Sequence, residues 1–157
     1  MAAFSYEYKV NGLQKVPAQI VGELCEQLQN SAAGLSPRTL LDASRQPSDP
    51  LHGEFEWDDT KAAENYRLHQ AAGIIRNIVI VTAEENGDVK QDRGFVSIPG
   101  GTSNYVTLDS AFHNDEWKAH LLEQARLDMK TFLGKYRRLQ ELADVNAAIQ
   151  AALKKPE

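Results

Sequence analysis

Two groups of side chains have the types and spacing for metal chemistry. His113, Glu116 and His120 stand three and four residues apart near an expected helix start, so one helix face would present ligands of the kind that zinc prefers. No further residue supplies a fourth ligand at a recognisable spacing. The acidic residues between positions 54 and 59 would suit magnesium, but aspartates that cap a helix beside a solvated loop explain the same residues. We therefore expect no metal and no other cofactor.

Nucleophilic catalysis also lacks its usual sequence signals. Cys25, the only cysteine, falls on one helical face with Val21, Leu24 and Leu28, which predicts a core position for its thiol. No serine stands in the glycine-flanked turn that exposes a nucleophile. The segment 99–102 does not lead directly into a helix whose N-terminus would bind phosphate. We expect the protein not to be an enzyme.

Six polar side chains are candidates for contacting nucleic acid. Four lie on a helix that we predict from Asp59 to Asn77, and two lie near the C-terminus: Lys61, Asn65, Arg67, Arg76, Arg137 and Arg138. Basic and amide groups of this kind contact phosphates and base edges. The charge balance argues against a strongly DNA-binding surface, because residues 51–112 hold five basic and ten acidic residues in a chain of net charge −5.

The hydrophobic pattern predicts an α+β fold in two parts. Residues 4–10 alternate with the period of a half-buried strand, Pro17 and Ser36-Pro37 each begin a helix, and the β-branched run 78–82 follows the helix 59–77. We predict that this run forms a hairpin with residues 94–98, that residues 105–108 add a short strand, and that the sheet is three-stranded and antiparallel. Apolar residues at helical spacing from Trp117 onwards predict a long amphipathic helix. The expected domains are an α+β domain over 1–112 and a C-terminal helical dimerisation region over 113–157.

The order of these elements is that of a winged helix-turn-helix protein with a dimerisation helix. In that interpretation the helix 59–77 enters a DNA groove and residues 84–92 form the wing. The wing would hold four acids and one lysine, which phosphates repel. The helix also has apolar residues on two opposite sides, so a central core helix covered on both sides is the alternative.

A single cysteine and the absence of a long apolar run bear on location. One cysteine excludes an intramolecular disulfide, which favours a reducing compartment. No run approaches the roughly 18 apolar residues of a membrane span. We expect a cytoplasmic protein that does not bind membranes.

One set of residues in the middle of the chain is distinctive: Leu51-His52-Gly53-Glu54-Phe55-Glu56-Trp57-Asp58-Asp59, then Ala62-Ala63, Tyr66-Arg67, Gln70-Ala71 and Ile74-Ile75. This set resembles a family of small phage and prophage proteins, and Phe95-Val96-Ser97 and the region 117–152 match the same plan. Asp49-Pro50 departs from the serine-proline that is common in that family. The family has no assigned activity, so the resemblance implies a phage-type accessory protein and no catalytic residues.

Two functions remain open at this point. The first is a nucleic-acid-associated accessory protein, DNA-binding or regulatory, that acts as a homodimer. The second is a protein that binds and modulates a host or phage protein. A positive face would favour the first, and an exposed apolar or acidic patch would favour the second.

Overall fold

A computed structural model describes residues 4–59, 63–99 and 105–155, and these residues form a mixed α+β fold as predicted. The chain divides into two compact units, Met1–His113 and Asn114–Glu157. The boundary that we expected lies one residue earlier. Both sheets and the main hydrophobic core belong to the first unit.

The first unit begins with the elements that the sequence predicts. Strand β1 (Phe4–Tyr8) is followed by helices α1 (Ala18–Gln29) and α2 (Pro37–Ala43). Ser36 caps α2, because its side chain accepts a hydrogen bond from the Thr39 N–H while the Thr39 hydroxyl accepts one from the Ser36 N–H. The cap fixes where α2 starts.

Asp59, where we predicted the third helix to begin, is not helical, and residues 60–62 lie outside the described residues. A short 3₁₀ turn (His52–Glu54) precedes an extended segment over 55–59, and α3 (Ala63–Asn77) leads directly into strand β2 (Ile78–Ala83). The end at Asn77 is confirmed. There the Asn77 side chain accepts a hydrogen bond from the Val10 N–H at 2.9 Å and donates one to the Val10 carbonyl at 3.0 Å, which fixes the end of β1 against the helix–strand junction.

The three-stranded antiparallel sheet is present, but its third strand is not the predicted one. The order is β1-β2-β3, with β3 at Val89–Arg93. Residues 95–97, which we placed in the hairpin, form β4 (Phe95–Ser97) and pair with β5 (Tyr105–Thr107) in a separate two-stranded sheet. Gly94 separates β3 from β4, and a side chain there would meet Ile78, so only glycine allows this close approach.

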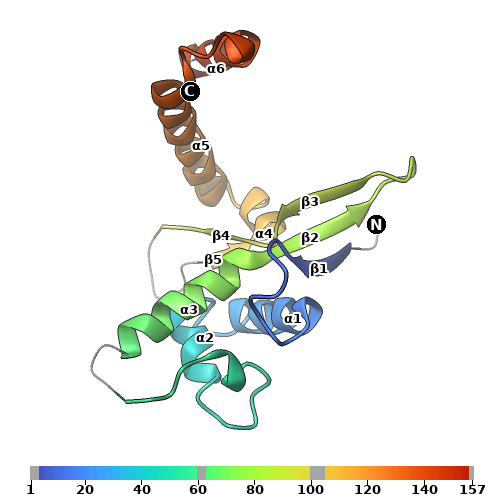
Figure 1. Cartoon of the computed structure of the whole chain (residues 1–157), viewed down its shortest axis with the longest axis vertical. Helices are drawn as coiled ribbons and strands as arrows, with labels where there is room; N and C mark the ends of the chain where they lie inside the picture. Colours follow the sequence, from blue (N-terminus) through green and yellow to red (C-terminus); the bar gives the residue numbers. More distant parts are fainter. Residues whose placement is uncertain (1–3, 60–62, 100–104, 156–157) are drawn as a thin grey trace. The chain divides into compact units, whose positions relative to one another are not determined.

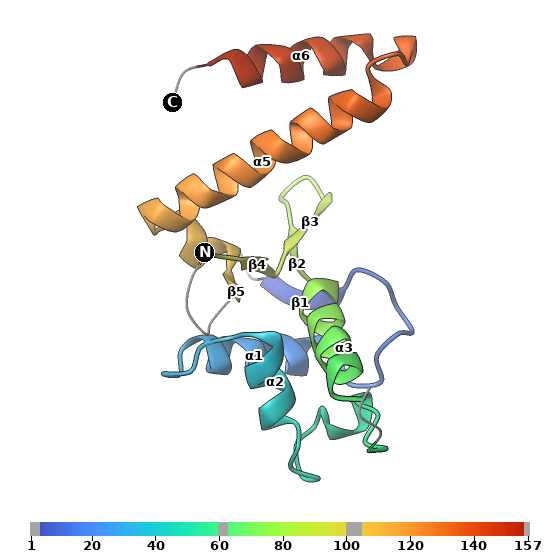
Figure 2. The ribbon, with the colours of Figure 1, turned by 90° about the vertical axis from the view of Figure 1, so that its left-hand side faces the viewer.

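The core of the first unit lies where α1, α2 and α3 meet the sheet. Helices α1 and α2 lie on one side of the β1–β2 pair (Figures 1 and 2). Tyr6 points into this core, stacks on Phe95 at 6.0 Å between ring centroids, and donates a hydrogen bond to Glu26. Gly22 leaves room for the Tyr6 ring against α1. A short helix, α4 (Leu108–Phe112), ends the unit.

The second unit is a pair of helices. Asn114 caps α5 (Asp115–Tyr136), a 3₁₀ turn (Gln140–Leu142) follows, and α6 (Ala143–Lys154) completes it. Gly134 does not split α5, which continues to Tyr136. Among the described residues of this unit only Leu133 and Asn146 are buried. A unit with so little buried apolar surface is poorly stabilised by its own packing.

Candidate functional site

The six candidate nucleic-acid-binding residues lie in different environments. Asn65 and Arg76 are exposed on α3 of the first unit, and Arg137 and Arg138 are exposed just beyond α5 in the second unit. Lys61 lies outside the described residues. Arg67 is buried, with 4% of its surface exposed. The structure therefore brings no more than part of the set to one surface.

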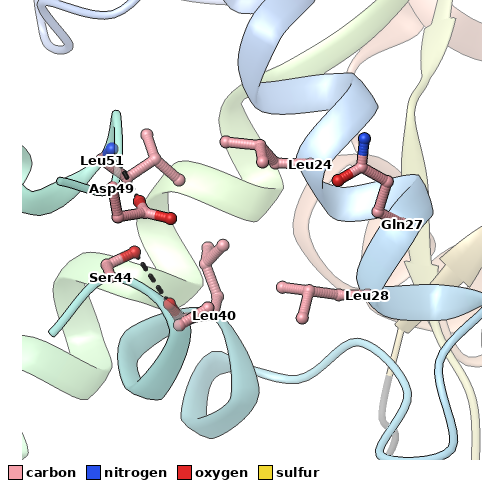
Figure 3. A pocket seen from close by; sticks show the side chains of 8 residues that line it. Leu24, Gln27, Leu28, Leu40, Ser44, Asp49 and Leu51 are labelled. Atoms are coloured by element: carbon pink, nitrogen blue, oxygen red, sulfur yellow. Dashed lines mark hydrogen bonds between the residues drawn. The ribbon is translucent and has the colours of Figure 1, made fainter. Parts of the chain in front are cut away.

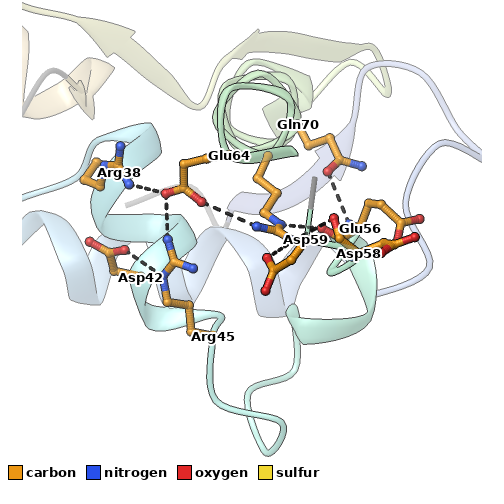
Figure 4. Close-up of polar contacts among 9 residues, drawn as sticks. Arg38, Asp42, Arg45, Glu56, Asp58, Asp59, Glu64 and Gln70 are labelled. Carbon is orange, nitrogen blue, oxygen red and sulfur yellow. Dashed lines mark hydrogen bonds and ion pairs between the residues drawn. The ribbon is translucent and has the colours of Figure 1, made fainter. Parts of the chain in front are cut away.

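Arg67 is held by the segment before its own helix. Its guanidinium donates to the carbonyls of Glu56 and Asp58 and to the carboxylate of Asp59, at 3.3 Å for the last. A second carboxylate, that of Glu64, lies at 3.5 Å (Figure 4). The guanidinium also stacks on the Trp57 ring, 5.1 Å from its centroid. Because these contacts occupy the Arg67 guanidinium, it is not available to bind a phosphate.

The distinctive residues from Leu51 to Asp59 form one structural clamp. Leu51 and Phe55 are buried. The rings of His52 and Trp57 stack at 4.7 Å, and the Trp57 indole N–H donates to the His52 carbonyl at 2.7 Å. Glu54 accepts backbone hydrogen bonds from residues 15 and 16. In this structure the motif ties a loop to α3, and Asp58 and Asp59 bind Arg67.

One side of α3 is left in contact with water. Its buried apolar residues, Ala63, Ala71, Ile74 and Ile75, lie on one side of the helix. Tyr66, on the other side of the helix, is 56% exposed. Within the first unit α3 is therefore covered on one side, and Asn65 and Arg76 lie among its exposed residues.

The turn of the expected wing is shorter than predicted, because residues 89–93 form strand β3. The turn is nevertheless acidic. It spans Glu84 to Asp88, with Gly87 at φ +86°. Lys90, the one basic residue of the segment 84–92, forms an ion pair with Glu84. The remaining acids of the segment are exposed. This tip would repel nucleic acid rather than bind it.

A cavity of about 240 Å³ opens between α1, α2 and the segment 49–51 (Figure 3). Its lining is mainly apolar: Leu24, Gln27, Leu28, Leu40, Ala43, Ser44, Asp49 and Leu51. The Ser44 hydroxyl donates to the Leu40 carbonyl at 2.9 Å, and one Asp49 carboxylate oxygen accepts from the Leu51 N–H at 2.8 Å. Gln27 and Asp49 therefore supply the polar groups of this cavity that remain able to bind a partner.

The sequence gives no sign of this cavity. Leu24 and Leu28 share a helical face with Cys25, so the pattern predicts core positions for them and not the wall of a cavity. A cavity arises where the surfaces of packed elements fail to fill the space between them. That mismatch depends on the placement of α2 and the following loop.

One residue of each metal-ligand pattern considered above, His113 and Glu54, has a hydrogen-bond partner within the chain. The His113 ring lies 2.8 Å from the Asp109 carbonyl, and Glu54 is bound to backbone N–H groups as described above. Within the ranges that the structure describes, no three His, Cys, Asp or Glu side chains are grouped to hold a metal ion. The helices in those ranges are also too short or too polar to cross a membrane.

Comparisons with protein-family models, with curated proteins and with solved structures gave no match.

Proposed function

We propose that this chain is a non-enzymatic accessory protein that acts by binding another protein, and that the cavity between α1 and α2 receives an apolar side chain of that partner. The observation that supports the proposal is the leucine lining of the cavity. An apolar side chain that leaves water for such a site contributes roughly 1.5–3 kcal/mol. The resemblance to phage and prophage proteins stays a prediction, and it gives the partner's class as a host or phage protein.

The size of the cavity favours a side chain over a small molecule. Sites for cofactors and drug-sized ligands usually measure roughly 300–1,000 Å³, whereas this cavity measures about 240 Å³. Protein partners commonly insert a few anchoring side chains into such pockets. One large or two small apolar side chains fit the volume.

The polar groups of the cavity specify the residue beside the anchor. Asp49 keeps acceptor capacity on its carboxylate, because the Leu51 N–H occupies one position only. Helix α1 contains two glutamates and no basic residue. We therefore expect the partner segment to carry a Lys or Arg one or two positions from its apolar anchor.

Selection from a random peptide library displayed on phage tests the proposal. The immobilised full chain should enrich peptides that combine an apolar residue with a neighbouring Lys or Arg. Ala43→Phe should abolish binding of the selected peptides, because Ala43 lines the cavity and is exposed, so a phenyl ring there fills the space. Ala83→Phe, a matched change at an exposed position outside the cavity, should leave binding unchanged.

Two results would overturn this function for the cavity. One is a failure to enrich any peptide. The other is equal affinity of the selected peptides for the wild-type chain and for Ala43→Phe, measured by isothermal titration calorimetry. Asp49→Asn keeps the acceptor for the Leu51 N–H and removes the charge, so it should weaken basic peptides while leaving the fold intact.

The second candidate function is nucleic-acid binding, and the basic end of α5 favours it. Lys135, Arg137 and Arg138 are exposed within four positions of one another. Gel-shift titration with duplex and single-stranded DNA at several salt concentrations tests it. The double change Arg137→Ala/Arg138→Ala should lower both the affinity and its salt dependence, whereas Arg76→Ala should not. An absence of binding at low salt would end this candidate.

A further inference from the structure

The apolar face of α5 is only partly covered, because Ala125, Met129 and Phe132 are half-buried while Leu122 and Tyr136 are exposed. Five residues form a stripe at steps of three and four, which is the seam of a two-helix coiled coil: Leu122, Ala125, Met129, Phe132 and Tyr136. Leu122 is 58% exposed and Tyr136 is 40% exposed. A stripe of this kind in water is stabilised when another helix covers it.

Helix α6 covers a different part of α5. The buried residue of α5 is Leu133, which lies at one edge of the stripe, and the Asn146 side chain of α6 donates to the Tyr136 carbonyl at 3.2 Å. The flank of the stripe opposite to Leu133 holds Asp128 and Lys135, both exposed. A second helix therefore has access to the stripe from the Asp128 side.

The charges along α5 indicate which helix fits. Asp128 and Lys135 lie on the same flank of the stripe, seven residues apart. When a helix of the same sequence runs antiparallel to α5 with Met129 opposite Phe132, Asp128 of each copy lies beside Lys135 of the other. A parallel copy in register places Leu133 beside Asp128, so neither charge gains a partner.

We infer that α5 pairs antiparallel with the α5 of a second copy of this chain, through the stripe from Leu122 to Tyr136. Antiparallel coiled coils place residues of one seam position against those of the other. With Met129 opposite Phe132 of the second copy, Asp128 of each chain faces Lys135 of the other. This inference goes beyond the proposed function and does not depend on it.

Charge reversal with rescue tests both the pairing and its direction. Asp128→Lys and Lys135→Asp, each alone, place two like-charge pairs in the dimer and should raise its dissociation constant about tenfold or more. The double variant Asp128→Lys/Lys135→Asp should restore it. A mixture of the two single variants should also associate, because the mixed dimer contains two attractive pairs. Sedimentation velocity over a range of concentrations measures all four samples.

Two charge reversals outside α5 serve as controls. Glu85→Lys and Lys9→Asp reverse exposed charges in the first unit and should leave the dissociation constant of the dimer unchanged. Circular dichroism confirms that each variant is folded. A wild-type chain that is monomeric at every concentration would overturn the inference and assign the stripe to a different protein. If neither the double variant nor the mixture restored association, the antiparallel direction would be wrong. A parallel dimer predicts that result, because Asp128 would not face Lys135 in it.

Discussion

Arg67 shows how a single side chain can be mistaken for a binding residue. It lies on the helix that would enter a DNA groove, and its type suits a phosphate contact. In the structure its guanidinium is surrounded by two backbone carbonyls, two carboxylates and the Trp57 ring. The sequence cannot reveal this, because the partners at 56–59 meet Arg67 only after the extended segment folds back on α3. The sequence therefore gives the residue type of Arg67 but not the contacts that its side chain makes.

We predict that Arg67→Ala lowers the free energy of unfolding by about 3 kcal/mol, because it removes a buried charge and leaves its hydrogen-bond partners without a donor. Arg76→Ala is the matched control on the same helix. Arg76 is exposed, so its loss should change the free energy of unfolding by less than about 0.5 kcal/mol. Urea denaturation of the two variants and the wild type measures both values. Equal stabilities would contradict the clamp.

A second prediction concerns the buried thiol and two tyrosines. Burial, with a smaller contribution from Glu26, raises the pKa of Cys25 from its ordinary value of 9.0 to about 12. Burial and the charge of Glu54 raise the pKa of Tyr8 from 10.0 to about 12, and burial and the hydrogen bond to Glu26 also raise that of Tyr6. The unfolded chain loses these protons first. Stability should therefore be full below about pH 9 and should fall as the pH rises towards 12.

The measurement is a set of urea titrations between pH 7 and pH 11. Each group contributes a slope of up to about 1.4 kcal/mol per pH unit. Cys25→Ala should be less stable at pH 7, yet it should lose less stability between pH 9 and pH 10, because in the unfolded chain the thiol ionises about one pH unit before each tyrosine. A thiol reagent should label Cys25 slowly in the folded protein and rapidly in urea. Rapid labelling at neutral pH without urea would show that the thiol is not buried.

At the scale of elements, the helices and strands that have a buried face could be predicted from the sequence. β1, α1, α2, β2 and β5 were each predicted, because alternation, helical spacing or a cap such as Ser36 marks them. Strand β3 was missed because every one of its residues is exposed, so it has no apolar pattern. The apolar run at Phe95 and Val96 was assigned to the hairpin in its place, although it is buried in the second sheet. Backbone pairing alone defines β3.

The packing of α1 on β1 gives a prediction about two helical glycines. A methyl group at Gly22 would overlap the Tyr6 ring, which is buried and cannot move away without disturbing Phe95. Gly22→Ala should therefore lower the free energy of unfolding by about 1–3 kcal/mol. Gly73→Ala, in α3, meets no atom within 4 Å and should raise it by up to about 1 kcal/mol. Thermal unfolding followed by circular dichroism gives both signs, and two shifts in the same direction would refute the close contact.

At the scale of the whole chain, the element order suggested more than it could establish. Strand, three helices and a hairpin are present, and the mixed fold follows from them. The order does not show that α3 enters a DNA groove. Three features argue against DNA binding by this surface: the turn is acidic, Arg67 is buried, and Lys90 forms an ion pair with Glu84. The α5 stripe was evident from helical spacing, whereas the cavity depends on how α1, α2 and the segment 49–51 pack and was not.

The distribution of the core between the two units gives the last prediction. Every residue of the main core cluster, from Tyr6 to Phe95, belongs to the first unit. A fragment of residues 1–113 should therefore fold alone, with an unfolding temperature that does not depend on concentration. The fragment 114–157 buries only two of its described residues, so as a monomer it should lose its helices on dilution, and it should regain them at high concentration if α5 pairs with itself.

Circular dichroism of the two fragments over a hundredfold range of concentration makes the comparison. The fragment 114–157 with Met129→Glu serves as the control, because a charge at the centre of the stripe prevents pairing and costs little in an isolated helix. Its helicity should stay low at every concentration. A fragment 114–157 that is fully helical when dilute would show that the two helices stabilise each other without a second copy, and a fragment 1–113 that fails to fold would show that the core needs the helical pair.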